Sequence, residues 1–218
     1  MLNGLKPVGR RWDQLGLRLF LLMWLALVLS HGVAWLLVTR VGGALPAFDY
    51  HIAMLSVPGA LGTRTETIPA AVPYLAADPA RVARWAERLG PRARPRIGLA
   101  WSGRPTHSND RNRSLTLGEL LPLLDEACDF VSLQKEVRAA DQALLDGGAA
   151  LRHFGSQIED FADTAALCAN MDLVISVDTS VAHLAGALAR PLWVLLPFVP
   201  DWRWLQERED NPWYPSAR

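Results

Sequence analysis

The segment VISVDTSVAHLAGAL (residues 174–188) turns from an apolar run into a helix-like pattern at Asp178-Thr179-Ser180. Asp, Thr and Ser are common at helix starts, because their side-chain oxygens accept hydrogen bonds from free backbone N–H groups. The same N–H groups and nearby hydroxyls also bind anions, since the helix dipole favours negative charge at this end. His183 follows one turn into the predicted helix and offers a further donor. The segment therefore predicts a buried strand and a helix, with a plain cap or an anion site between them.

Strands and helices alternate on both sides of this segment. Helix-like patterns lie between the apolar runs, and Thr116 with Glu119 predicts a capping box for the first of them. Strands that alternate with helices at this spacing form a parallel sheet wound by right-handed crossovers. The predicted fold class is α/β, with a Rossmann-like doubly wound parallel sheet over residues 96–218. The predicted strands are RIGLAW (96–101), FVSLQ (130–134), LRHFG (151–155), DLVISV (172–177) and PLWVLLP (191–197).

The residues before this sheet differ in composition. Residues 42–80 are rich in Gly, Pro and Thr, which predicts a connecting region with short elements. A helix is predicted over residues 77–90, with Asp78 as N-cap, Pro79 in the first turn and Gly90 beyond the end. We therefore expect three domains, which are residues 1–41, 42–95 and 96–218.

Residues 19–38 run without a formally charged side chain, and a run of this length can span a bilayer. Basic residues precede it, so the positive-inside rule would keep the N-terminus cytoplasmic. The alternative divides the run at Ser30-His31-Gly32 into a helix and a strand of a globular fold. Polar residues at the middle of a bilayer are costly, which favours this alternative. Membrane association through residues 19–38 stays open at this point.

The composition excludes some classes of protein. The 22 Lys and Arg residues balance 22 Asp and Glu residues, whereas nucleic-acid binding through counterion release requires a positive excess. Cys128 and Cys168 lack C-x-x-C spacing, so both are predicted to be reduced core residues. No Cys and His cluster in the sequence has zinc-ligand spacing, so no metal site is expected.

Polar residues follow several of the predicted strands, and parallel sheets bind ligands at the carboxyl ends of their strands. Arg suits forked hydrogen bonds to phosphate, and Lys supplies a mobile point charge. The carboxylate of Asp178 would repel phosphate, so we expect it to accept hydrogen bonds from sugar hydroxyls or to cap the helix. The sequence has no G-x-G-x-x-G, P-loop or G-x-S-x-G motif, which removes the main support for a dehydrogenase, an NTPase or an α/β-hydrolase. The candidate binding residues are Ser102, Gly103, Arg111, Arg113, Gln134, Lys135, Asp178, Thr179, Ser180 and His183.

Four stretches resemble a known family, and they are WSGRPTHSNDRNRSLTLGEL (101–120), FVSLQK (130–135), DFADTAALCANMDLVISVDTSVAHLAGALARPLWVLLPFVPDWRWL (160–205) and NPWYP (211–215). They are similar to the C-terminal glycosyltransferase region of bacterial tetratricopeptide-repeat proteins and to the heptosyltransferases of glycosyltransferase family 9, which have the GT-B fold. More distantly, they look like O-linked N-acetylglucosamine transferases. The resemblance covers about residues 42–218 and implies the C-terminal lobe of a GT-B fold with a truncated N-terminal lobe.

The resemblance also implies roles for individual residues. The Asp-Thr-x-x-x-His pattern of heptosyltransferases falls on Asp178, Thr179 and His183, which would hold the nucleotide-sugar. Ser180 stands where the family usually has Gly. The basic residue that neutralises the diphosphate matches Arg113 best and Arg111 second. The family implies transfer without a metal ion or cofactor, in which the helix dipole and cationic side chains stabilise the departing nucleoside diphosphate.

The predicted function is the transfer of a sugar from a nucleotide-sugar to an unknown acceptor, a glycan or a protein, in the cytoplasm. The catalytic base stays unassigned, because fewer than a hundred residues precede the predicted donor lobe. We expect a truncated member of the family. The alternatives are a non-catalytic remnant that binds a nucleotide-sugar or a partner, and a membrane-anchored scaffold.

Overall fold

The computed structural model describes residues 50–53 and 56–218. The predictions for residues 1–41, including the apolar run 19–38, lie outside the described residues. The chain divides into two compact units, Met1–Val57 and Pro58–Arg218, and the predicted sheet lies in the second. Within the described ranges, no helix combines the length and the apolar character needed to cross a membrane.

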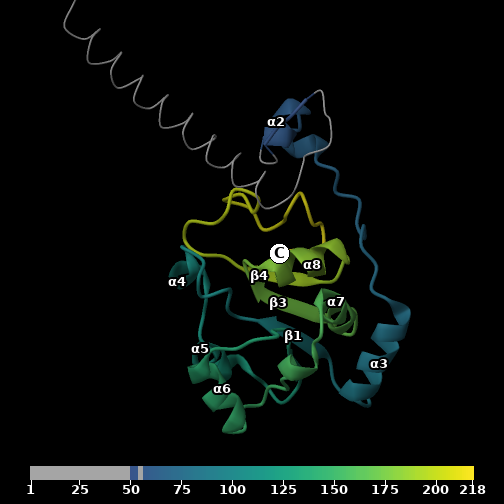
Figure 1. Ribbon diagram of the computed structural model, residues 1–218, viewed down its shortest axis with the longest axis vertical. Helices are drawn as coiled ribbons and strands as arrows, with labels where there is room; N and C mark the ends of the chain where they lie inside the picture. The colour runs from purple at the N-terminus through teal and green to yellow at the C-terminus, as the bar shows by residue number, and fades with distance from the viewer. Residues whose placement is uncertain (1–49, 54–55) are drawn as a thin grey trace, which may run out of the picture. The chain divides into compact units, whose positions relative to one another are not determined.

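The second unit is built on a four-stranded sheet in which every neighbouring pair of strands is parallel (Figure 1). Strand β1 (Arg96–Ala100) is central, and its Gly98 lies opposite Val131 of one neighbour and Val174 of the other. The expected α/β class and parallel sheet are therefore confirmed. In spatial order, the strands are β2 (Asp129–Ser132), β1 (Arg96–Ala100), β3 (Leu173–Val177) and β4 (Leu192–Leu195).

The strand predicted over residues 151–155 is wrong. Arg152 forms only a single bridge with Val131, with backbone hydrogen bonds of 3.0 and 2.8 Å on its two sides. The chain then enters a 3₁₀ helix, η4 (Gly155–Gln157). A Cβ atom at position 155 would lie 2.2 Å from the carbonyl oxygen of Lys135. The backbone at Gly155 thus packs directly against the loop after β2. At this close approach, residues 151–155 cannot continue as a strand beside β2.

Helices cover both faces of the sheet, so the sheet is doubly wound. In Figure 1, α3 (Pro79–Leu89) and α7 (Phe161–Ala169) lie to the right of the sheet, and α5 (Leu117–Leu120) and α6 (Ala139–Asp146) lie at the lower left. The helices that contribute to the first core are α3 (Pro79–Leu89), α7 (Phe161–Ala169) and α8 (Ser180–Ala187), and those of the second are α5 (Leu117–Leu120) and α6 (Ala139–Asp146). The remaining short elements are α2 (Val57–Ala60), η2 (Thr65–Thr67), α4 (Asp110–Arg113) and η3 (Leu121–Leu123).

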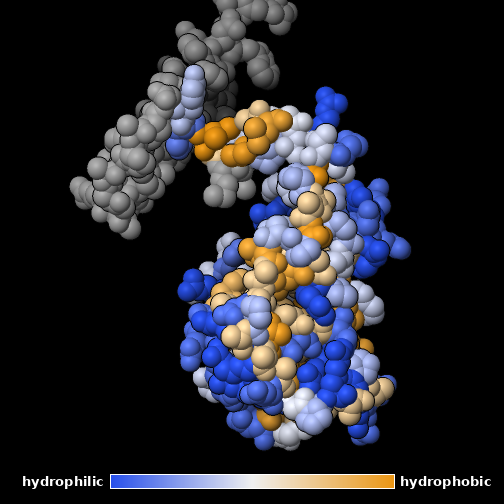
Figure 2. Space-filling model, turned by 90° about the vertical axis from the view of Figure 1, so that its right-hand side faces the viewer, coloured by the Kyte–Doolittle hydropathy of each residue, from blue (hydrophilic) through white to orange (hydrophobic). Residues whose placement is uncertain are grey.

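Two hydrophobic cores lie between the sheet and these helices. Successive strand residues point to opposite faces, so Ala100 belongs to the first core and Leu99 to the second. Cys168 is fully buried in the first core, and this burial raises the pKa of its thiol to about 12. Cys128 is half-buried, and both cysteines are free. The outer surface on the side of α3 is largely hydrophilic, with smaller apolar patches (Figure 2).

The predicted ends of α3 are confirmed. The carboxylate of Asp78, the N-cap, accepts a hydrogen bond from Ala80 N–H at 2.8 Å, and Gly90 at the C-cap has a φ of 70°. Arg96 and Arg152 donate to the carbonyl of the last helical residue, Leu89, and cations at this end complement the helix dipole. The capping box of α5 is also present, with Thr116 N–H donating to Glu119 Oε2 at 2.7 Å.

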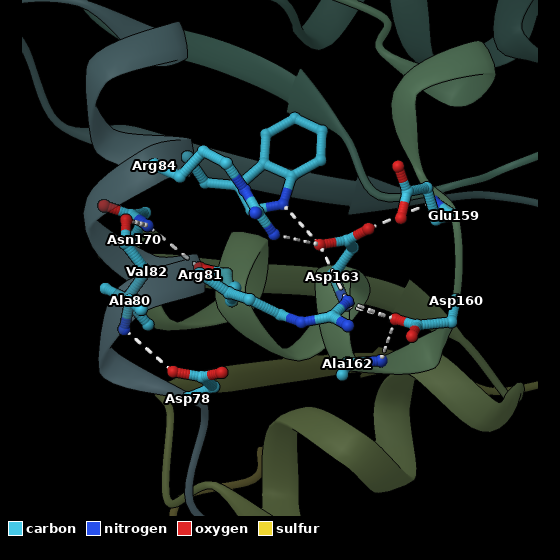
Figure 3. A network of polar contacts seen from close by, with 12 residues as sticks. Asp78, Ala80, Arg81, Val82, Arg84, Glu159, Asp160, Ala162, Asp163 and Asn170 are labelled. Atoms are coloured by element: carbon cyan, nitrogen blue, oxygen red, sulfur yellow. Dashed lines mark hydrogen bonds and ion pairs between the residues drawn. The ribbon is translucent and has the colours of Figure 1, made fainter.

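Asp163 joins α3 to α7 through a buried carboxylate (Figure 3). It accepts hydrogen bonds from the Trp85 indole (3.2 Å) and Glu159 N–H (3.1 Å), and it pairs with the Arg81 guanidinium (3.1 Å). Burial acts to raise the pKa of Asp163, but the hydrogen bonds from Glu159 and Trp85 and the charge of Arg81 hold it below its ordinary value. The ionised carboxylate is therefore part of the folded structure.

Replacing Asp163 by Ala should lower the free energy of unfolding by about 2–4 kcal/mol, because buried donors lose their acceptor. Urea denaturation at pH 7 measures this change. The wild type should also lose part of its stability as the pH falls below the unfolded pKa of about 3.9, and the variant should lose less. The control is Asp146→Ala in α6, where the exposed carboxylate accepts from Gln142 at 2.8 Å. Equal stability of both variants would contradict the assignment.

Candidate functional site

The buried side chain of Gln134 joins the loops that follow β1 and β2. Its carbonyl oxygen accepts hydrogen bonds from the backbone N–H groups of Trp101 (2.8 Å) and Ser102 (2.9 Å). Its amide nitrogen donates to Ser102 Oγ (3.1 Å) and to the Glu136 carbonyl (3.2 Å). Both ends of the amide have partners within the protein, so Gln134 fixes the shape of this edge of the sheet.

A buried carboxylate, Asp110, holds the loop that returns from β1 toward α5. Asp110 accepts a hydrogen bond from Ser114 Oγ (2.6 Å) and forms an ion pair with Arg138. The same Ser114 oxygen accepts from Gly103 N–H at 2.9 Å. The network links the loop after β1 to the segment after β2 and fixes where the side chain of Arg138 lies.

Arg113, at the end of α4, reaches across to the loop after β3. Its Nη1 donates to the carbonyl of Asp178 at 2.7 Å. The guanidinium lies against Gly103, where a Cβ atom would be 2.6 Å from Nη2. Its Nε is buried and has no hydrogen-bond partner among the residues that the structure describes. Because the partner of Nη1 is a neutral carbonyl, the positive charge of Arg113 remains available to an anion.

The start of α8 lies beside this guanidinium. Thr179 is the N-cap, but its hydroxyl makes no cap hydrogen bond and instead lies 3.2 Å from Ser176 Oγ. The first turn contains no acidic residue. The Thr179 hydroxyl thus accepts from none of the first N–H groups of α8, although the Thr179 carbonyl accepts from Ala182 N–H at 3.1 Å. The sequence left a plain cap and an anion site as alternatives here. A helix start of this kind favours a bound anion.

His183 lies one turn into α8, with its Nε2 3.8 Å from Asp178 Oδ1. Burial lowers the pKa of His183 below its ordinary value; Arg203 acts in the same direction, whereas Asp178 and Asp201 oppose it. The imidazole is therefore neutral at neutral pH and can donate one hydrogen bond from one nitrogen.

Two cavities, of about 740 and 520 Å³, lie at the carboxyl ends of the strands. We call them the larger and the smaller cavity. Arg113, Thr179 and Ser180 line both, so the two cavities adjoin at the start of α8. The larger cavity is also lined by Ser102, Gly103, Gln134 and Lys135, and the smaller by Asp178 and His183.

Arg111 is the predicted residue that lines neither cavity, and its side chain is exposed. Lys135 is exposed at the rim, where its ammonium donates to the Glu159 carbonyl at 2.8 Å. The family resemblance matched Arg113 first and Arg111 second, and the structure brings only Arg113 to the wall that the two cavities share.

Three further cations line the cavities and were missed in the sequence. Arg104 and Arg138 line the larger cavity, and Arg203 lines the smaller one beside Asp201, to which it is paired at 2.9 Å. All three follow predicted strands, so position along the sheet edge was the available signal. In residues 50–53 and 56–218, no three His, Cys, Asp or Glu side chains gather in an arrangement that could hold a metal ion.

Comparison with known proteins gives a match to one family in this part of the chain. The family model described as glycosyltransferase family 9 (heptosyltransferase) matches residues 159–195. This range runs from the N-cap region of α7 through β3 and α8 to the end of β4, and it contains Asp178, Thr179 and His183.

Longer stretches of the chain are similar to two known proteins. Protein FlbA of Caulobacter vibrioides is 35% identical over an alignment of 182 residues that covers 78% of this chain. The chain spans only 29% of the length of that relative. The structure of ADP-heptose lps heptosyltransferase II of E. coli matches with a TM-score of 0.48 and 22% identity, over 70% of this chain and 47% of that chain. The segment from α7 to β4 is thus the part of this chain that matches glycosyltransferase family 9.

Proposed function

We propose that the unit Pro58–Arg218 is the donor-binding part of a glycosyltransferase and that it binds a nucleotide-sugar at the carboxyl edge of its sheet. The main support for the proposal is that two cavities adjoin at the guanidinium of Arg113. Arg113 and the start of α8 lie between the larger and the smaller cavity. The match to glycosyltransferase family 9 over residues 159–195 supports the same class of ligand.

A nucleotide-sugar has the layout that this edge would accommodate. Its diphosphate is a compact anion with a nucleoside on one side and a sugar on the other. The anion fits the helix start and the guanidinium of Arg113, because both provide donors with positive charge. The two adjoining cavities would then receive the two neutral parts of the ligand.

The residues around the smaller cavity suit the sugar. Asp178 is an acceptor for sugar hydroxyls, and neutral His183 donates one hydrogen bond. In sugar transfer, the bond between the sugar and the diphosphate breaks, and negative charge builds up on the leaving phosphate. Arg113 and the N–H groups of α8 would stabilise this charge in place, with no change of their own positions.

The first test compares two arginines of the same short segment. Arg113→Gln should weaken the binding of the preferred donor among UDP-, GDP- and ADP-sugars by about tenfold to a hundredfold, since a charged hydrogen bond contributes about 1.5–3 kcal/mol. Arg111→Gln is the matched control and should bind like the wild type, because its side chain lies outside both cavities. Isothermal titration calorimetry measures both. If no donor binds to the wild type, or if both variants bind equally well, the proposal fails.

A second prediction concerns Gly103, against which the Arg113 guanidinium packs. In Gly103→Ala the new Cβ atom would lie 2.6 Å from Nη2, so the flexible end of Arg113 must move. Donor affinity should fall about three- to tenfold with little change in the melting temperature, because only the mobile end of a side chain has to give way. Gly118→Ala is the control, where the nearest atom would be 3.7 Å away. Unchanged affinity in Gly103→Ala would show that the position of Arg113 is unimportant for binding.

The third prediction is that binding needs no divalent metal ion. The positive charge for the diphosphate is assigned to Arg113 and the helix start, so EDTA should leave the affinity unchanged. Titration of the donor with and without EDTA, after dialysis against a chelating resin, measures this. A marked loss of affinity that Mg²⁺ restores would contradict the assignment.

A further inference from the structure

The His183 ring contacts two aromatic side chains of the C-terminal segment, Trp204 and Tyr214. Its ring stacks on Trp204, with 5.1 Å between centroids and 18° between planes. The ring of Tyr214 lies on another side, at 5.7 Å and 55°. Trp204 is buried and Tyr214 half-buried. The imidazole of His183 is therefore held from two directions, by residues that the binding of a nucleotide-sugar does not explain.

Gly186 allows Tyr214 to approach α8 so closely. Gly186 lies three residues after His183, on the same face of the helix. A Cβ atom at this position would lie 2.4 Å from Cγ of Tyr214, so a larger residue would push the ring away. The segment before α3 is fixed nearby, where the N–H groups of Tyr74 and Leu75 donate to the Ala187 carbonyl at 3.1 and 3.2 Å.

The hydroxyl groups form a short chain that ends at His183. The Tyr74 hydroxyl donates to the Tyr214 hydroxyl (3.4 Å), and the Tyr214 hydroxyl lies 3.1 Å from His183 Nδ1. When the Tyr214 oxygen accepts from Tyr74, the single proton of its hydroxyl is free to donate a hydrogen bond to Nδ1. A neutral imidazole with Nδ1 as acceptor carries its proton on Nε2. This tautomer also suits the other neighbour, because Nε2 is 3.8 Å from the Asp178 carboxylate.

We infer that Tyr214 is a positioning residue for His183: its hydroxyl fixes the tautomer of the imidazole, so that Nε2–H is presented to the smaller cavity as a donor. Tyr74 is the outer member of the chain and holds the Tyr214 hydroxyl in its donating orientation. The ligand that Nε2–H meets, an oxygen of the sugar or of the adjoining phosphate, rests on the proposed function. The assignment of the tautomer does not depend on the proposed function.

The charges around the imidazole agree with this arrangement. Asp178, Asp201 and Arg203 are the charged groups that affect His183, and burial outweighs the two acids in keeping its pKa low. Burial and the hydrogen bond from Tyr74 raise the pKa of Tyr214, so the phenol keeps its proton. Protonation of His183 would require the Tyr214 hydroxyl to turn its proton away from Nδ1, because a doubly protonated imidazole has no acceptor.

The test uses the full chain labelled with ¹⁵N at histidine and long-range ¹H–¹⁵N correlation spectra across a pH titration. His183→Gln identifies the His183 signals among those of the other histidines. In the wild type, Nδ1 should give the signal of an unprotonated, hydrogen-bonded nitrogen, and Nε2 that of a protonated one. Tyr214→Phe keeps the ring but removes the hydroxyl. In this variant the Nδ1 signal should move toward that of a free acceptor, and the midpoint of the His183 titration should rise.

Several results would overturn the inference. A protonated Nδ1 in the wild type would do so without any variant, and so would unchanged Nδ1 signal and midpoint in Tyr214→Phe. Tyr74→Phe removes only the outer hydroxyl and should change both readouts less, so a larger change there would contradict the order of the chain.

Donor titration separates this inference from the proposed function. If the wild type binds a nucleotide-sugar, Tyr214→Phe should lower its affinity about three- to tenfold, and an unchanged affinity would contradict the presentation of Nε2–H to the ligand. If no nucleotide-sugar binds to the wild type but the spectra are as expected, the proposed function fails and the positioning of His183 by Tyr214 stands.

Discussion

The parallel pairing of β1 with β2 on one side and β3 on the other is the constraint on which the candidate site depends. Parallel strands end at the same edge, so the loops after these three strands must emerge side by side. Gly98 lets the core close over β1, since a Cβ atom there would lie 2.7 Å from Leu133 and 2.9 Å from Met171. With the three loops adjacent, Gln134 reaches Ser102, and Arg113 reaches the carbonyl of Asp178.

The sequence predicted those features that depend on neighbouring residues. Asp78 and Gly90 at the two ends of α3 act within a few residues of the helix they terminate, and so does the capping box of Thr116 and Glu119. The order of strands and helices follows from hydrophobic patterns of the same short range. The strand predicted over 151–155 failed because its residues are fitted to a distant contact, the close approach of Gly155 to the Lys135 carbonyl. No local pattern carries that information.

The sequence predicted only part of the residues of the candidate site, because local patterns carry no information about distant contacts. The position of a residue after a strand placed Asp178, Thr179 and Ser180 at the sheet edge. It could not separate Arg111 from Arg113, because the turn of α4 carries one guanidinium into the shared wall and leaves the other exposed. It also could not tell that the amide of Gln134 is used within the protein. The role of Tyr214 could not be predicted from the sequence, because only the packing of the C-terminal segment against Gly186 brings Tyr214 to His183.

Helix α8 connects these observations, because its two ends serve different purposes. Its first turn lies at both cavities, whereas the rest of the helix is almost entirely buried. Contacts from Tyr74, Trp204 and Tyr214 converge on this helix from segments far apart in the sequence. Groups that bind a developing charge work best when they are already fixed in position. Lys135 has the opposite character: its side chain is exposed, and its ammonium donates to the carbonyl of Glu159. Arg104 is likewise exposed at the larger cavity. A helix start fixed by packing, with exposed cations at the rim, would hold the centre of a ligand firmly while the rim adjusts to its outer part.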